Sequence, residues 1–322
     1  MREPMIPVTV IVPNYNSGAY LSESIESINS GQWPAEILII DDCSTDDSLE
    51  LAMKLQHKYS NIRLVKKEVR EGAAEARRLG IIHATQNWIS CIDADDRLEV
   101  DALKEAYENV IISGSDICIF ELWRFDEKKI WKHDANPKDF PKTGTEAVLL
   151  TFGGWQIHPL GVARKSLYEK AYHGFAEKSL CADELITRLV FSFAIKVVGC
   201  SKKYFYRSNL LSTTRILNSH RLSSLRCHLW LFKFAQSYKE APLGKMVRGS
   251  IGEAWFYWTQ QKRIGTFATL NALRSFLAEI YSINGLLRML LQSPKHLVAL
   301  IFLSMAVWTQ EKLMKNIGNW HE

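Results

Sequence analysis

Short runs of apolar residues alternate with segments of helical periodicity from the start of the chain. The run 8–12 (VTVIV) is continuous and β-branched, which is typical of a strand buried on both faces of a parallel sheet, and Pro13-Asn14-Tyr15-Asn16 ends it. Residues 21–28 then carry apolar side chains at the i, i+4, i+7 spacing of a helix. The next apolar run, 37–40, ends at Asp41-Asp42. This pattern predicts a β-α-β unit.

The same alternation continues to residue 122. The predicted elements are a helix carrying Leu51 and Leu55, a strand at 62–65, a helix at 73–83, a strand at 88–92, a helix at 101–112 and a strand at 116–122. The strand at 88–92 runs directly into Asp93-Ala94-Asp95-Asp96. Ligands of open α/β sheets bind beyond the carboxyl ends of the strands, so we expect Tyr15, Asp42 and residues 93–96 to converge at one edge.

The pattern changes after residue 122. A polar stretch at 126–145 predicts a flexible loop, and a helix at 183–194 precedes a short strand at 195–198. Beyond residue 214 basic and large apolar residues alternate without any strand signal, which predicts an all-helical region.

Charge separates this helical region from the rest of the chain. The 322 residues carry a net charge of +5, but residues 215–322 hold 14 basic and 5 acidic side chains, whereas residues 1–214 hold 26 and 30. The acidic first part argues against nucleic-acid binding, and the basic, aromatic-rich last part favours an anionic membrane surface. The alternative is a helical subdomain that packs on the core or on a second subunit, as in a homodimer.

Neither secretion nor a membrane span is expected. Residues 1–7 hold no apolar segment long enough for a signal peptide, and the longest apolar run, 297–308, is shorter than the about 20 residues of a spanning helix. The six cysteines are scattered without a C-x-x-C pair, so we expect small buried hydrophobic side chains of a reducing compartment. These features predict a cytoplasmic protein, peripheral on the inner face of a membrane.

Asp93-Ala94-Asp95 offers hard oxygen ligands of the kind that Mg²⁺ or Mn²⁺ shares with phosphate groups. Carboxylates in a turn are commonly only solvated or capping. Here they follow a wholly apolar strand, and a second strand also ends in paired aspartates, so a cation would make their shared pocket tolerable.

Several ordered motifs resemble glycosyltransferase family 2, the inverting group with the GT-A fold. They are VTVIVPNYN at 8–16, IIDDCSTD at 39–46, GAAEARRLG at 72–80, IDADD at 92–96, ADELITRL at 182–189, and Tyr206-Arg207 followed by Ser212. The resemblance implies a GT-A-type, Rossmann-like mixed sheet flanked by helices. It also implies a nucleotide-sugar-binding half at 1–105 and an acceptor-binding half at 106–214, followed by the basic helical region at 215–322.

The resemblance implies donor-side roles for residues of the first half. Pro13 and Tyr15 would surround the nucleobase, and Asp42 would accept a hydrogen bond from a uracil N–H, as an ionised carboxylate can. Arg77 would approach the donor phosphates or Asp95. The alternatives without a role in donor binding are a helix cap for Asp42 and a surface charge for Arg77.

The same resemblance assigns the aspartates after the fourth predicted strand. Asp93 would touch the ribose and Asp95 would ligate Mn²⁺ or Mg²⁺, which neutralises the charge of the leaving nucleoside diphosphate. Asp96 could substitute in either role.

Asp183 matches the general base that removes the proton of the acceptor hydroxyl. Ala182 stands where the family frequently has an acidic residue. Because Glu184 lies next to Asp183, it is the alternative candidate for the base. A helix cap is the alternative role of Asp183.

Two further segments match places where the family contacts its substrates. Trp155 and His158 would face the acceptor or the donor sugar. The alternative for Trp155 is a purely structural role in the hydrophobic core. Arg207, with Tyr206 and Ser212, would fold over the pyrophosphate and contact it, or be a plain surface charge.

These features predict an inverting, metal-dependent glycosyltransferase that moves a sugar from a nucleotide sugar, with a UDP-sugar favoured, to a saccharide or lipid-linked acceptor in surface polysaccharide synthesis. A nucleotidyltransferase is the nearest rival enzyme, but its usual Gly-rich, basic phosphate loop is replaced here by Pro13-Asn14-Tyr15-Asn16. A catalytically silent nucleotide-sugar-binding scaffold is the alternative from another class.

Overall fold

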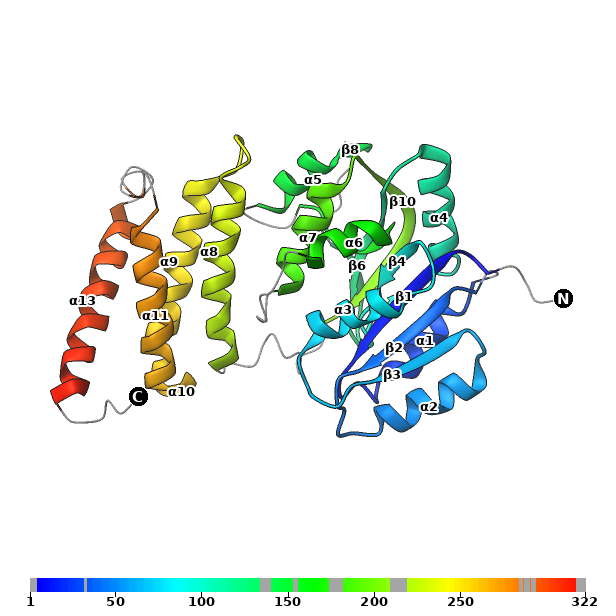
Figure 1. Cartoon of the computed structure of the whole chain (residues 1–322), viewed down its shortest axis with the longest axis horizontal. Coiled ribbons are helices and arrows are strands. Elements are labelled where there is room, and N and C mark those ends of the chain that lie inside the picture. The colour runs from blue at the N-terminus through cyan, green and yellow to red at the C-terminus, as the bar shows by residue number, and fades with distance from the viewer. Residues whose placement is uncertain are drawn as a thin grey trace. The chain divides into compact units, whose positions relative to one another are not determined.

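The computed structural model describes residues 5–31, 34–133, 140–152, 156–173, 182–208, 219–283, 286, 290 and 294–316. They form two compact units, the first between residues 5 and 208 and the second from residue 219 onward (Figure 1). The three regions proposed from sequence, divided after residues 105 and 214, stay a prediction.

The first unit begins with four parallel strands. Their order in the sheet is β3-β2-β1-β4, with bounds β1 Val8–Asn14, β2 Glu36–Asp41, β3 Ile62–Lys66 and β4 Trp88–Cys91. The connecting helices are α1 Leu21–Ile28, α2 Ser48–Lys58 and α3 Ala73–His83. β2 is buried along its whole length and β1 along nearly all of it, because helices cover both faces, which explains their unbroken apolar runs. The predicted β-α alternation is confirmed.

The second half of this unit extends the sheet with mixed strand directions. β9 (Gly161–Arg164) pairs antiparallel with both β4 and β6 (Ile117–Phe125), and β10 (Lys196–Arg207) runs parallel to β6. Short strands complete it: β5 Arg97–Leu98, β7 Ile130–Lys132 and β8 Lys142–Thr143. The helices are α4 Ala102–Ser113, α5 Gly144–Thr151, α6 Lys165–His173 and α7 Ala182–Phe193. The result is the predicted mixed α/β sheet flanked by helices.

Three predictions for this half were wrong in detail. Within 126–145, expected to be a loop, β7 pairs with β6, β8 pairs with β10, and a Thr143–Glu146 capping box starts α5. β10 extends far beyond the predicted 195–198, and β9 was missed. β9 depends on a close approach that only glycine permits, since a Cβ on Gly161 would lie 2.1 Å from the Cys118 carbonyl oxygen.

The second unit is helical in its described part, as expected. Its elements are η2 Ser219–Leu222, α8 Ser223–Ala235, α9 Leu243–Thr259, α10 Gln261–Ile264, α11 Thr266–Tyr281 and α13 Pro294–Asn316. Their apolar stripes meet in a separate core that includes Leu225, Ile251, Phe276 and Leu303. Among the helices that the structure describes, none is long and apolar enough to span a membrane.

Of the five described cysteines, two are buried as expected and three are only partly buried. Cys43, Cys91, Cys118, Cys200 and Cys227 are free thiols, of which Cys118 and Cys227 are buried. Cys181 lies outside the described residues.

A carboxylate network joins α8 to α9 inside the second unit. Glu253 Oε1 accepts hydrogen bonds from Ser224 Oγ (2.6 Å) and Tyr257 Oη (2.7 Å), and Oε2 lies 3.0 Å from His228 Nδ1. Burial alone would raise the pKa of Glu253, but the bond and charge of His228 and the bonds from Ser224 and Tyr257 lower it to about 2. Since the ordinary value is 4.5, this network stabilises the fold above that pH and is lost as the pH falls toward 2.

We expect Glu253→Gln to lower the free energy of unfolding at pH 7 by up to about 3 kcal/mol and to flatten its dependence on pH between about 5 and 2. Urea denaturation at several pH values measures both effects. Glu279→Gln is the control in the same unit, because the partner of its side chain among the described residues is the exposed Lys233, and loss of this ion pair costs about 0.5 kcal/mol or less. An unchanged pH slope in Glu253→Gln would contradict the assignment.

Candidate active site

The loops that follow β1 and β2 are fastened to each other at the carboxyl edge of the sheet. Asn14 Nδ2 donates to Asp41 Oδ1 at 2.7 Å and lies 3.1 Å from both Ser44 Oγ and Ser48 Oγ. Asn16 adopts a left-handed backbone (φ 51°), and its side-chain oxygen accepts the Thr45 N–H at 2.7 Å. Hydrogen bonds therefore join residues 13–16 and 41–46 into one surface, which we call the ledge.

Pro13 and Tyr15 are partly exposed on this ledge. The Arg70 guanidinium lies 3.7 Å from the centre of the Tyr15 ring, a cation–π contact that covers one face of the ring. The structure thus brings both predicted nucleobase residues to the edge where Asp42 also lies.

Asp42 is buried at the end of β2 and is held by three donors. Oδ1 accepts Lys67 Nζ (2.5 Å) and the Glu71 N–H (3.0 Å), and Oδ2 accepts the Gly72 N–H (2.7 Å). Burial alone would raise the pKa of Asp42, but Lys67 and the two N–H groups outweigh it and lower the pKa. Asp42 is therefore an ionised acceptor at neutral pH.

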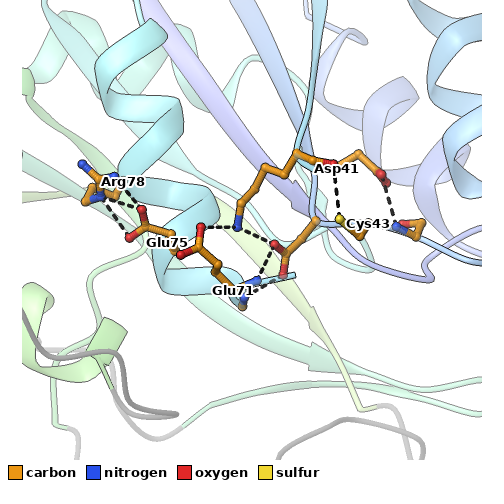
Figure 2. A network of polar contacts seen from close by, with 9 residues as sticks. Asp41, Cys43, Glu71, Glu75 and Arg78 are labelled. Carbon is orange, nitrogen blue, oxygen red and sulfur yellow. Dashed lines mark hydrogen bonds and ion pairs between the residues drawn. The ribbon is translucent and has the colours of Figure 1, made fainter. Parts of the chain in front are cut away.

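Figure 2 shows how this network continues into the start of α3. Lys67 Nζ lies 3.4 Å from Glu71, Cys43 Sγ donates to the Lys67 carbonyl oxygen, and Glu75 pairs with Arg78 one turn further along. Lys67 was missed from the sequence, because a lysine after an edge strand carries no signal of the buried carboxylate that it neutralises.

Asp96 anchors the turn that carries the D-x-D motif. Its Oδ2 accepts Tyr204 Oη at 2.6 Å and its Oδ1 accepts the Arg207 N–H at 2.7 Å, both from β10. Burial and the charges of Asp93 and Asp95 raise the pKa of Asp96 well above its usual range, against the bonds from Tyr204 and Arg207. Both oxygens of Asp96 accept hydrogen bonds from β10, so its carboxyl group positions the turn, and the alternative that it substitutes for Asp93 or Asp95 stays a prediction.

Arg207, the last residue of β10, also contacts this turn through its side chain. Its Nε donates to the Asp95 carbonyl oxygen at 2.7 Å, its Nη2 pairs with Glu23 of α1, and its guanidinium stacks near the rings of Tyr20 and Phe125. Glu23 also pairs with Arg97 at 2.7 Å. Glu23 was missed from the sequence, where it reads as an ordinary acidic residue in the first turn of a helix.

Arg77 joins the D-x-D turn to the start of α7. Its Nη2 lies 2.6 Å from Asp93 Oδ1 and its Nη1 lies 3.4 Å from Asp183 Oδ2. Burial alone would lower the pKa of Arg77, but the charges of Asp93 and Asp183 raise it well above its usual value, so the guanidinium stays cationic. Two carboxylates 90 positions apart in the chain thereby share one cation and one site.

The neighbouring carboxylates of α7 point to different partners. Asp183 faces Arg77 with its side chain about half exposed (47%), whereas Glu184 Oε2 lies 3.3 Å from Arg188 Nη1 within α7. Of the two candidate bases, Asp183 is the one that the geometry links to Asp93.

The remaining sequence candidates are less informative. His158 is buried and its Nδ1 accepts the Leu160 N–H at 3.3 Å; burial, reinforced by the charge of His133, lowers its pKa to about 3, so it is neutral at physiological pH. Trp155 and Ser212 lie outside the described residues.

The carboxylates of this turn could hold a divalent cation only in part. Among the described residues no three His, Cys, Asp or Glu side chains cluster closely enough to hold a metal by themselves. Asp93 and Asp95 are partly exposed on one turn, and Asp95 lies close enough to raise the pKa of Asp96. This set fits Mg²⁺ or Mn²⁺ only if a substrate supplies further oxygen ligands.

Comparison with solved structures shows the fold. Staphylococcus aureus TarS residues 1–349 in complex with UDP-GlcNAc superimposes with a TM-score of 0.63 at 17% identity, covering 85% of this chain and 82% of that one. The chain thus has the GT-A fold.

Sequence relatives point the same way. Glycosyltransferase GlyG of Streptococcus pneumoniae is 32% identical over 121 residues, which are 37% of this chain and 40% of GlyG. The poly(ribitol-phosphate) beta-N-acetylglucosaminyltransferase TarS of Staphylococcus aureus is 26% identical over 208 residues, 63% of this chain and 35% of TarS. The chain therefore spans well under half the length of both relatives. The family model described as "Glycosyl transferase family 2" matches residues 9–170, half of the chain. These matches, on top of the shared fold and the joined carboxylates, place the chain in glycosyl transferase family 2.

Proposed function

We propose that this glycosyltransferase moves a sugar from a UDP-sugar to a hydroxyl acceptor by a single displacement with inversion. The observation that carries the proposal is the Arg77 bridge between Asp93 and Asp183. One side of a reaction centre needs a group near the leaving diphosphate and the other needs a base near the attacking hydroxyl. The Arg77 guanidinium holds Asp93, the candidate group on the diphosphate side, and Asp183, the candidate base, on two of its nitrogens.

Asp183 acts as the base in this proposal. It accepts the proton of the acceptor hydroxyl as that oxygen attacks the anomeric carbon, and its exposed carboxylate is open to an incoming alcohol. Arg77 keeps the carboxylate oriented toward the donor side and balances the charge of Asp93. A single base suffices because the leaving diphosphate needs no proton from the protein when its charge is neutralised otherwise.

The uridine end of the donor would lie on the ledge formed by Pro13, Tyr15 and Asp42. A carboxylate has about four lone-pair positions, and three donors of the chain already contact Asp42. The remaining position is the one proposed for the uracil N3–H. Cytosine presents a lone pair at the same ring atom, so it would face the carboxylate without a bond.

Asp95, with Asp93 beside it, would hold Mn²⁺ or Mg²⁺ together with diphosphate oxygens of the donor. The bound cation would supply neutralisation of the charge that develops on the leaving nucleoside diphosphate. Asp96, Tyr204 and the Arg207 N–H fix the turn on which these carboxylates stand. Arg207 would exchange its contact with Glu23 for a diphosphate oxygen.

The acceptor is proposed to be a saccharide or lipid-linked saccharide of surface polysaccharide synthesis. Support comes from the similarity to TarS, a poly(ribitol-phosphate) beta-N-acetylglucosaminyltransferase. Because the match covers 35% of TarS, the proposal names the class of acceptor and no particular acceptor.

We expect Asp183→Asn to lower the rate of sugar transfer by about 10²- to 10⁴-fold, because the base is lost, while the affinity for UDP stays within about threefold. Initial rates with a panel of UDP-sugars, and UDP titration calorimetry, measure the two quantities. Glu184→Gln is the matched control and should keep the rate within about tenfold, since Glu184 pairs within its own helix. A larger loss of transfer rate in Glu184→Gln than in Asp183→Asn would instead assign the base to Glu184.

The cation proposal predicts that Mn²⁺ tightens UDP binding by about tenfold or more over a sample containing EDTA, because the metal shares ligands with the diphosphate. Asp95→Asn should remove most of this difference. Glu50→Gln, an exposed change on α2 at a residue that pairs only with the next turn, should leave it intact. Equal UDP affinity with Mn²⁺ and EDTA would exclude a cation at this site.

Base recognition is checked with nucleoside diphosphates that lack a sugar. UDP should bind at least about tenfold tighter than CDP, because a site built to accept a hydrogen bond rejects an analogue without the donor. Asp42→Asn should narrow this ratio, and the thermal midpoint of the variant shows whether the ledge stays folded. A CDP affinity equal to that of UDP would remove Asp42 from base recognition.

A further inference from the structure

The last described helix, α13, is apolar on two opposite faces. On its inner face Leu300, Leu303 and Val307 are buried in the core of the second unit. Its outer face is also apolar, although no described residue of the unit covers it. The large side chains that stand half exposed (47 to 59%) are Val298, Ile301, Phe302, Met305 and Trp308.

The outer side chains form one continuous stripe. At 100° per residue they fall within an arc of about 120°, and the stripe runs for about 15 Å along the helix. Tyr281 of α11 widens it at the side, because its hydroxyl lies 2.8 Å from Ser304 Oγ and its ring is half exposed. Single exposed apolar residues are ordinary on protein surfaces, but a contiguous stripe indicates a contact surface.

Positive charge borders the stripe at both ends. Lys295 and Lys312 are exposed, and Lys312 Nζ lies 4.1 Å from the centre of the Trp308 ring. The one acidic residue of α13, Glu311, is turned away from the stripe, with its side chain mostly buried near Arg274. The exposed face of residues 295–312 therefore presents apolar side chains, two lysines and Thr309 but no carboxylate.

The area of the stripe decides between a second copy of the chain and a lipid surface. Five side chains that each expose about half of roughly 200 Å² offer about 500 Å². A stable protein interface needs about 800 Å² from each partner. A helix lying in a membrane interface needs only an apolar face, an aromatic residue at the headgroup level and basic residues for anionic lipids.

We propose that the outer face of α13, with Tyr281 beside it, binds the surface of an anionic lipid bilayer, with the helix parallel to the membrane plane. The apolar stripe enters the boundary between headgroups and acyl chains, while Lys295 and Lys312 remain at the level of the anionic headgroups. The proposal goes beyond sugar transfer and stands without it, because it concerns only where the chain is held.

The test is co-sedimentation of the full chain with vesicles, in the absence of any donor. Phosphatidylcholine vesicles containing phosphatidylglycerol are compared with vesicles of phosphatidylcholine alone. The wild-type chain should bind the anionic vesicles at least about tenfold more strongly, because each lysine near an anionic surface adds about fivefold.

Two variants separate the apolar contribution from the charge. Ile301→Ser/Phe302→Ser/Trp308→Ser should weaken binding to anionic vesicles by about tenfold or more, and Lys295→Glu/Lys312→Glu should remove the preference for anionic lipid. The matched control, Ile82→Ser/Ile112→Ser/Ile195→Ser, changes three exposed apolar residues of the first unit and should bind as the wild type does.

Three outcomes would overturn the proposal. The first is an absence of binding by the wild-type chain, and the second is equal binding by the two serine variants. The third is a concentration-dependent dimer in light scattering that the α13 serine variant alone abolishes, since this would assign the face to a second copy. The donor-free measurement keeps these outcomes separate from a failure of the transferase proposal.

Discussion

The buried carboxylate of Asp96 is the interaction on which the site depends. It lies one residue beyond the D-x-D motif and takes hydrogen bonds from the Tyr204 hydroxyl and the Arg207 N–H, both on β10. The turn after β4 is thereby fixed to a strand that lies more than 100 residues away in the chain. Without this attachment the turn that carries Asp93 and Asp95 would lose two of its hydrogen bonds to β10 and would depend more on Arg77 and on the Arg207 side chain.

Arg77 completes the arrangement from the other side. Asp183, which must accept a proton in the proposed reaction, needs a carboxylate whose charge is not fully neutralised. Asp93, near the proposed diphosphate, needs a counter-charge. By pairing at 2.6 Å with Asp93 and at 3.4 Å with Asp183, Arg77 balances the first more closely than the second. The same guanidinium sets the separation between the two halves of the proposed reaction.

The predictable part of the fold was the part with long, regular patterns. β1 to β4 and α1 to α4 follow from apolar runs and helical spacing, since their burial is decided locally by the β-α alternation. β9 could not be predicted, because four residues pair between two strands only where Gly161 allows backbone contact. β10 was too short in the prediction because its second half gains its partners, β5 and β6, only in the folded sheet.

The candidate site shows the same limit. The motifs located Asp42, Arg77, Asp93 and Asp183, and the structure gathers the last three. Tyr204, Glu23 and Lys67 were missed, since each acts through a contact with a residue distant in sequence, and an isolated tyrosine, glutamate or lysine carries no pattern. Arg77 was expected to approach phosphates or Asp95, but in this structure its partners are Asp93 and Asp183.

Every contact described at the reaction centre is made within the first unit, and the last strand of that unit, β10, ends at Arg207. The helical unit contributes none of the described groups of this centre. A substitution confined to the described helices of the second unit therefore leaves the contacts among Arg77, Asp93 and Asp183 in place.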